Sequence, residues 1–338
     1  MPRAVRTDIV QPDGRHVYLY GDFEPAPAGY RAPAMPNGVY QRRWNPLRRE
    51  WVLVAASRQA RTFLPDRADC PLCASGPEHS SEIPAARFEA AVFENRFPSM
   101  VPWPPAGGLC EVVVYTAAHD GSFATLASAE LDRLAEVWTD RYRALTARRG
   151  IKYVFIFENR GEQVGVTLNH PHGQIYGYPF VPPVAATELG RHAGGCLQCR
   201  VIRDEITAKR RILINEGSIV AYVPEAARWP YEVHVATRAH RAALPDVPPA
   251  GRRAILTAMQ RVTRAYDRLF ELPMPYMMSM HQSPGEVSAQ AHLHVEFYPI
   301  LRDRGRLKYL AGSESGAGVF INDTLAEESA DRLRSVLE

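Results

Sequence analysis

The sequence predicts an α+β protein made of two related units, each a mainly antiparallel sheet with flanking helices. The first observation is a repeat at constant spacing: His170 and His292 lie 122 positions apart, and so do His172 and His294. The second observation is that each half contains short apolar runs, typical of strands, on both sides of one long stretch with helical periodicity. A repeat found in the sequence outranks any single element assignment.

Matching segments extend the duplication beyond these histidines. His119 and His240 are 121 positions apart, and each follows an alanine. The run Glu-Val-Val-Val at 111–114 corresponds to Glu-Val-His-Val at 232–235. We therefore expect three parts: an N-terminal arm at residues 1–41, a first unit at 42–181 and a second unit at 182–338.

The composition is that of an ordinary globular protein. The chain has 338 residues, of which 46% are apolar, and this length fits about two domains. No apolar run approaches the ~20 residues of a membrane span, and the N-terminus lacks the apolar core of a signal peptide. We expect a cytoplasmic protein. A net charge of +3 with scattered arginines disfavours a nucleic-acid partner.

The elements follow in chain order. Residues 1–41 contain two short β-like runs and are expected to pack loosely or to contact another subunit. In the first unit, helical periodicity covers residues 123–149, and Gly150 ends that helix. Its strands are expected at 51–55, which reads as buried, and at 90–94, 110–115 and 153–157. In the second unit, a helix is expected at 250–271 and strands at 211–215, 230–235, 276–280 and 292–298.

Four of the five cysteines form two Cys-x-x-Cys pairs, a pattern that favours metal binding over disulfides in a cytosolic chain. Taken alone, either pair is explained equally well by chance or by a redox motif as by metal binding. Each half, however, offers two cysteines and two histidines in the same order, which is a closed tetrahedral zinc set. The two sets are Cys70, Cys73, His119 and His170, and Cys196, Cys199, His240 and His292.

A rival set exists for the second metal. Glu188, His281, His294 and Glu296 offer oxygen and nitrogen ligands suited to iron or zinc. The cysteine-containing set is favoured because its ligand order copies that of the first half.

The motif His170-Pro171-His172-Gly173-Gln174 carries the chemistry. In an extended segment, His170, His172 and Gln174 share one face, because side chains alternate along a strand. Pro171 places the motif at a strand end or edge. Such a face could bind a metal, attack an electrophile or hold a phosphate oxygen; the plain alternative is a pair of surface histidines.

This motif, together with Cys70-Pro71-Leu72-Cys73, His119 and the run Phe157–Gly161, resembles the galactose-1-phosphate uridylyltransferases. They are the transferase branch of the histidine-triad superfamily, whose hydrolases carry a third histidine where Gln174 stands. The resemblance runs from about Arg42 to the C-terminus and implies two duplicated histidine-triad-like units. It also implies that UDP-glucose and galactose 1-phosphate exchange to UDP-galactose and glucose 1-phosphate through a uridylylated histidine.

The residues fit such a reaction. A neutral imidazole is a competent nucleophile near pH 7, so His172 would attack the α-phosphorus while a backbone carbonyl holds its other N–H. His170, bound to zinc, would fix the strand that carries His172. Gln174 would donate to a non-bridging phosphoryl oxygen, because the departing sugar phosphate is already a stable anion and needs little protonation.

The resemblance also implies substrate contacts and a homodimer. Its phosphate-binding positions fall on Arg58, Arg61, Asn159, Gly165, Val166 and Thr167, its nucleotide contact on Asn95, and its hexose contacts on Lys308, Tyr309 and Glu314. The family places the hexose contacts in the active site of the partner subunit.

Three departures from the family pattern bear on specificity. Glu296 stands where many members have a histidine, Cys196 and Cys199 are absent from those members, and Arg96 replaces a common acidic residue or asparagine. Cysteine pairs at the second position resemble the related ADP-glucose phosphorylase and some bacterial members of the family. A nucleoside-diphosphate-sugar phosphorylase that uses inorganic phosphate is the alternative function. A two-zinc binding module without catalysis leaves the His-Pro-His-Gly-Gln motif without a role.

Overall fold

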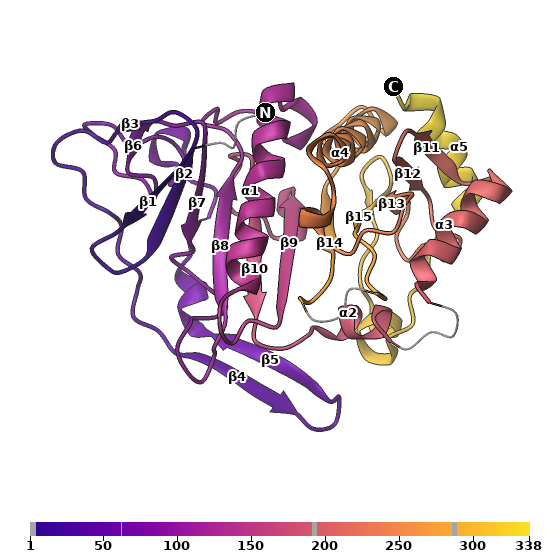
Figure 1. Cartoon of the computed structure of the whole chain (residues 1–338), viewed down its shortest axis with the longest axis horizontal. Helices are drawn as coiled ribbons and strands as arrows, with labels where there is room; N and C mark the ends of the chain where they lie inside the picture. The colour runs from indigo at the N-terminus through magenta and orange to yellow at the C-terminus, as the bar shows by residue number, and fades with distance from the viewer. Residues whose placement is uncertain (1–4, 62, 191–194, 286–288) are drawn as a thin grey trace. The chain divides into compact units, whose positions relative to one another are not determined.

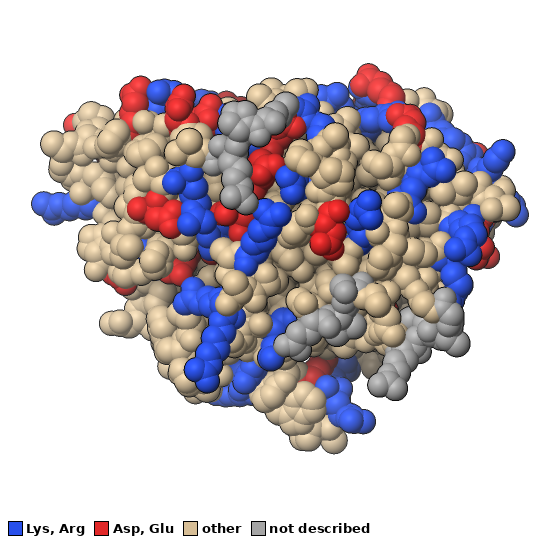
Figure 2. Space-filling view, viewed as in Figure 1, with Lys and Arg blue, Asp and Glu red and all other residues tan. Residues whose placement is uncertain are grey.

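The computed structural model describes residues 5–61, 63–190, 195–285 and 289–338 (Figure 1). The chain forms two compact units, the first from residues 1–156 and 167–188 and the second from residues 157–166 and 189–338. Within the described ranges, no helix is long and apolar enough to cross a membrane. On the face drawn in Figure 2, basic and acidic side chains are interspersed.

The first unit is an antiparallel sheet with the helix α1 (Ser128–Thr146) packed on one face. The spatial order of its strands is β1-β2-β7-β8-β10-β9. These strands are β1 (Arg6–Val10), β2 (His16–Tyr20), β7 (Ala90–Glu94), β8 (Leu109–Val114), β9 (Tyr153–Arg160, which continues into the second unit) and β10 (His172–Tyr178). The smaller elements are β3 (Glu24–Pro25), β6 (Ala85–Arg87), β4 (Tyr40–Asn45), β5 (Glu50–Ala55) and α2 (Pro183–Glu188).

The second unit has the same plan. Its strands are arranged β14-β15-β13-β12-β11, and α4 (Pro249–Leu269) lies between β13 and β14 in the chain. The strands are β11 (Ile212–Glu216), β12 (Ile219–Tyr222), β13 (Val233–Thr237), β14 (Tyr276–His281) and β15 (His294–Pro299), with α3 (Leu197–Ala208), α5 (Ala326–Val336), β16 (Leu301–Asp303) and β17 (Arg306–Leu307) outside this sheet.

Comparison of the two strand orders confirms the predicted fold class. In both units two antiparallel strands are followed by a long helix and two more strands, and the last of these four lies between the second and the third: β7-β8-β10-β9 and β12-β13-β15-β14. The long helices begin and end within five residues of their predicted bounds. Trp138 of α1 and Tyr266 of α4 are fully buried, as expected of core residues.

Two expectations were wrong. Residues 51–55 are not a buried strand, because β5 pairs with β4 in a separate hairpin that leaves Trp51 37% and Val52 44% exposed. Of the two alternatives for the N-terminal segment, loose packing is wrong, because β2 pairs with β7 and its Val17 and Leu19 lie in the core, whereas the subunit contact stays a prediction.

A buried ion pair joins the sheet of the first unit to its helix. Arg141 of α1 donates from Nη2 and Nε to the two carboxylate oxygens of Glu111 on β8, at 2.6 and 3.0 Å. Both side chains are at most 4% exposed, and the guanidinium also lies over the ring of Tyr18. Two parallel hydrogen bonds fix the approach of helix and sheet better than apolar contact alone.

Removal of one partner of this pair should destabilise the first unit strongly. We expect Glu111→Ala to lower the free energy of unfolding by about 3–5 kcal/mol, because it leaves a buried guanidinium without a counter-charge. Glu24→Ala is the matched control, since Glu24 pairs with Arg87 at the surface, where an ion pair contributes little to stability. Urea unfolding of both variants measures the difference. Equal losses in the free energy of unfolding would contradict the stabilising role of the Arg141–Glu111 pair.

Candidate active site and metal clusters

The first cluster brings together Cys70, Cys73, His119 and His170, with one ligand atom of each within 4.8 Å of every other. Cys70 and Cys73 form a tight turn in which the Cys73 amide donates to the Cys70 carbonyl. The Cys73 Sγ lies 3.2 Å from Nδ1 of His119 and 3.6 Å from Nδ1 of His170. Cys70 and His170 are almost wholly buried.

A hydrogen bond behind the cluster orients His170. Its Nε2–H donates to the carbonyl of Thr116 at 2.8 Å, so the Nδ1 lone pair faces the sulfurs. Burial lowers the pKa of His170 to about 4 and keeps the ring neutral. Burial and the neighbouring Cys70 raise the pKa of Cys73 to about 12. A bound divalent cation would reverse the shift at Cys73, because it stabilises the thiolate.

The second cluster repeats this geometry with Cys196, Cys199, His240 and His292. The Cys199 Sγ lies 3.5 Å from Nδ1 of His240 and 3.3 Å from Nδ1 of His292, and His292 Nε2–H donates to the Thr237 carbonyl at 2.7 Å. The two histidine rings are 5.4 Å apart at 83°, compared with 5.5 Å and 86° in the first cluster. Both clusters could hold a metal ion, and two thiols with two imidazoles are compatible with zinc.

His172 opens β10 immediately after the first cluster. Its Nδ1–H donates to the carbonyl of His170 at 2.7 Å, which leaves the Nε2 lone pair free. The side chain is half-buried, and burial lowers its pKa, so the ring is neutral near pH 7. Gln174 is also half-buried and lies on the same face of the strand. The arrangement presents a neutral imidazole beside a side-chain amide.

The second unit repeats the hydrogen bond but not the environment. His294 Nδ1–H donates to the His292 carbonyl at 2.7 Å, yet His294 is only 7% exposed. Its ring stacks on His281, and its Nε2 lies 3.4 Å from Glu296. His281, His294 and Glu296 of the rival metal set thus lie together, and the fourth member, Glu188, belongs to the first unit.

Sequence reasoning missed the surroundings of His234, which the structure places between two carboxylates. Its Nε2 lies 3.0 Å from Glu232 and 3.3 Å from Glu296. Burial opposes protonation, but the charge of Glu296 and the bond to Glu232 together raise the pKa of His234. The signal was the register of β13 and β15, which sets His234 opposite Glu296. That register is readable only once the strands are paired.

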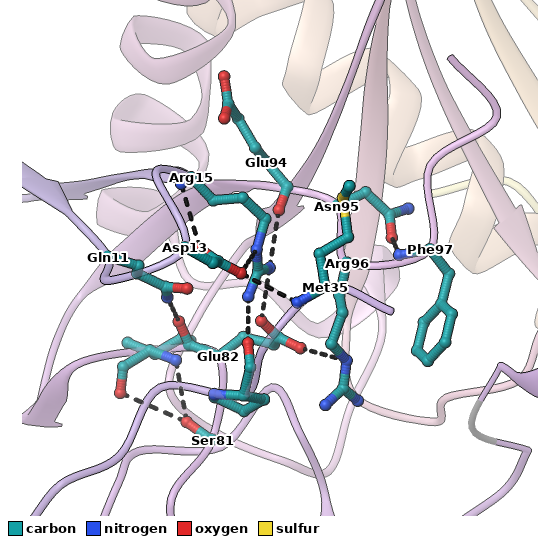
Figure 3. Close-up of polar contacts among 12 residues, drawn as sticks. Gln11, Asp13, Arg15, Met35, Ser81, Glu82, Glu94, Asn95, Arg96 and Phe97 are labelled. Carbon is teal, nitrogen blue, oxygen red and sulfur yellow. Dashed lines mark hydrogen bonds and ion pairs between the residues drawn. The ribbon is translucent and has the colours of Figure 1, made fainter. Parts of the chain in front are cut away.

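In the first unit, Arg58 and Asn95 meet at one turn. Arg58 Nη1 donates to the Phe97 carbonyl at 2.8 Å, and Asn95 Oδ1 accepts from the Phe97 amide at 2.8 Å. Figure 3 shows the neighbouring Arg96, which pairs with the buried Glu82 at 2.9 Å. Arg61, three residues after Arg58, is exposed.

The same buried carboxylate anchors the N-terminal segment. Arg15 donates to Glu82 at 2.9 Å and to the carbonyls of Glu94 and Pro33, while its Nε pairs with Asp13 (Figure 3). The turn that carries Asn95 is therefore tied to the core of the first unit through Glu82.

In the second unit, Lys308 and Glu314 form a buried ion pair at 2.7 Å. Glu314 also accepts from the backbone amides of Ala311 and Ile321, and the bond from Lys308 lowers its pKa to about 2. Tyr309 between them is 71% exposed.

The phosphate-binding positions that the resemblance implies before the motif divide between the units, Asn159 on β9 and the others in the loop that follows. Asn159, Gly165 and Val166 belong to the second unit and Thr167 to the first, where its carbonyl accepts from the Leu64 amide at 2.8 Å. Gly165 has φ of 79°, which favours glycine at this turn.

Comparisons with known proteins agree with this geometry. The family models for the N-terminal and C-terminal domains of galactose-1-phosphate uridyl transferase match residues 32–182 and 187–338. A galactose-1-phosphate uridylyltransferase of Thermotoga maritima is 38% identical over 315 residues, which cover 86% of this chain and 97% of that protein.

Two solved structures share the fold. A structure described as a uridylyltransferase has a TM-score of 0.79 and 31% identity, and the match covers 88% of this chain and 98% of that one. An ADP-glucose phosphorylase from Arabidopsis thaliana with bound ADP-glucose has a TM-score of 0.69 and 20% identity, with coverage of 89% and 100%. From the two matching domain models and these relatives, the chain belongs to the galactose-1-phosphate uridylyltransferase family.

Proposed function

We propose that this chain exchanges UMP between UDP-glucose and galactose 1-phosphate, with His172 as the residue that carries the uridylyl group. The observation that supports this most is the hydrogen bond from His172 Nδ1–H to the His170 carbonyl, which leaves Nε2 as the free nucleophilic atom. Family membership supplies the substrates, because the curated relatives bear the name of this activity.

The reaction runs as two displacements at the α-phosphorus. In the first, His172 Nε2 forms a P–N bond as the P–O bond to glucose 1-phosphate breaks. The ring then carries a positive charge, and its Nδ1–H bond to the His170 carbonyl strengthens because the donor is charged. In the second, a phosphate oxygen of galactose 1-phosphate attacks, the P–N bond breaks, and UDP-galactose leaves with His172 neutral again.

Gln174 is the residue we assign to the phosphoryl oxygen. Its amide NH₂ would donate to a non-bridging oxygen as negative charge develops there, and the loss of such a donor costs a few kcal/mol of transition-state stabilisation. A neutral amide suits this role because the leaving sugar phosphate needs no proton.

We further propose that both clusters hold zinc. Four protein ligands leave no position for water, so the ion supplies structure and does not activate a nucleophile. Cys70, Cys73, His119 and His170 would hold the first ion, and Cys196, Cys199, His240 and His292 the second. The first ion would fix the strand on which His172 lies.

The remaining substrate contacts follow the family resemblance. We propose Arg58, Arg61, Asn159 and residues 165–167 for the phosphates and Asn95 for the nucleotide. Lys308, Tyr309 and Glu314 would contact the hexose in the partner subunit of a cytoplasmic homodimer. Of these three, exposed Tyr309 is free to reach a neighbour, whereas the ion pair of Lys308 with Glu314 shapes the segment that presents it.

A nucleoside-diphosphate-sugar phosphorylase is the second candidate, favoured by the cysteine-containing second cluster. The two functions share the first displacement and differ in the acceptor. Release of the uridylyl group by galactose 1-phosphate supports the exchange reaction, whereas release by inorganic phosphate alone supports the phosphorylase.

Substitution of the two motif histidines should separate catalysis from metal binding. We expect wild-type protein mixed with UDP-glucose to gain one uridylyl group in intact-mass spectra, and His172→Ala to gain none while it keeps both metal ions. His170→Ala should lose one metal ion and melt at lower temperature, because structural zinc contributes folding energy. His294→Ala, at the repeat position of His172, is the control and should still be labelled. Equal metal loss in His170→Ala and His172→Ala would contradict these roles.

Metal analysis of cysteine variants tests the two clusters. We expect Cys73→Ala and Cys199→Ala each to lose one zinc ion per chain, since each removes a thiolate ligand, and Cys110→Ala to lose none, because its thiol belongs to neither cluster. Elemental analysis of the purified variants measures this. Unchanged zinc in Cys199→Ala would contradict the second cluster. A metal ion that persists in a variant with both Cys73→Ala and Cys199→Ala would favour the set of Glu188, His281, His294 and Glu296.

A further inference from the structure

The amide of Gln174 needs a fixed orientation if it is to act as proposed. A glutamine side chain presents an acceptor oxygen on one side and a donor NH₂ on the other, and rotation about its last torsion exchanges them at little intrinsic cost. With the oxygen turned toward the substrate, the amide would repel a phosphoryl oxygen. Something must therefore select the rotamer that presents the NH₂ group.

We infer that Tyr176 is a positioning residue that selects this rotamer, an inference that rests on the function proposed for Gln174. Tyr176 lies two residues further along β10, on the same face of the strand. Its hydroxyl donates to Gln174 Oε1 at 3.2 Å. With its oxygen held by Tyr176, the amide presents its NH₂ group as a donor to the substrate.

A second hydroxyl lies where it can donate to Tyr176. The Ser99 Oγ lies 3.2 Å from the Tyr176 hydroxyl. Each hydroxyl has a single proton, so when Tyr176 donates to Gln174 it accepts from Ser99. The result is a chain in which Ser99 donates to Tyr176 and Tyr176 donates to Gln174. Successive hydrogen bonds of one direction polarise one another and strengthen the last donor, here the Gln174 NH₂ group.

The surroundings keep Tyr176 in the donor form. The residue is 7% exposed, and burial raises the pKa of its hydroxyl well above the usual value, so it stays protonated throughout the working pH range. The buried thiol of Cys110, which pairs with Tyr176 across β8 and β10, also contacts the hydroxyl. A thiol is a weak hydrogen-bond partner and does not compete with the amide oxygen.

The test is a double-mutant cycle on the single-turnover rate of uridylyl transfer from UDP-glucose. We expect Tyr176→Phe, which keeps the ring and removes the hydroxyl, to slow transfer about tenfold with KM changed less than about twofold, and to retain its metal content and melting temperature. In the Gln174→Ala background the same substitution should have no further effect, because residues that act as a unit are not additive.

Tyr178→Phe is the matched control. This tyrosine lies on the same face of β10 and its ring packs against Tyr176 and Phe180, and within the described residues no hydrogen bond from its hydroxyl is found. We expect its transfer rate to equal that of wild type. Should Tyr176→Phe fold poorly, Ser99→Ala replaces it in the double-mutant cycle. We expect Ser99→Ala to slow transfer by a smaller factor and to have no effect in the Gln174→Ala background.

The outcomes separate the two claims. An unchanged rate in Tyr176→Phe, or a loss of the same size with and without Gln174, would overturn the positioning role while wild-type labelling on His172 upholds the proposed function. An absence of labelling on wild-type His172 would instead overturn the proposed function itself.

Discussion

One hydrogen bond organises the proposed catalytic face of the first unit: the bond from His172 Nδ1–H to the backbone carbonyl of His170 at 2.7 Å. The carbonyl is itself fixed, because the His170 ring lies in the Cys₂His₂ cluster and donates its Nε2–H to Thr116. The proposed metal ligand and the proposed nucleophile are thus two positions apart on one backbone segment. A metal ion that fixed the position of His170 would therefore also fix the tautomer and the orientation of the His172 ring.

The duplication shows how a shared scaffold gives different chemistry in its two copies. The second unit retains the cluster, the strand order and the hydrogen bond from His294 to the His292 carbonyl. It differs at the position of Gln174, where Glu296 stands, and this carboxylate lies 3.3 Å from His234, 3.6 Å from His281 and 3.4 Å from His294. His172 is half-buried beside a neutral amide and is accessible to an anionic substrate. His294 is buried beside a carboxylate, which excludes and repels such a substrate.

Much of the fold and of the metal clusters could be predicted because a repeat constrains residues far apart in the sequence. The ligand order of the second cluster was readable only by comparison with the first. The strand β5 was expected, but its exposure was not, because an apolar run does not reveal whether another layer of the protein covers it. The contacts of His234, the ion pair of Lys308 with Glu314 and the bond from Tyr176 to Gln174 depend on strand register or loop path, which local patterns do not fix.

The most direct test of the central claim is the site of phosphorus–nitrogen bonding in the trapped uridylyl intermediate. Protein labelled with ¹⁵N-histidine, mixed with UDP-glucose and separated from glucose 1-phosphate, can be examined by NMR for coupling between phosphorus and ring nitrogen. A bond to Nε2 of His172, with Nδ1 still protonated, is the expected result. A bond to Nδ1, or to any other histidine, would show that the His170 carbonyl does not hold the ring as described.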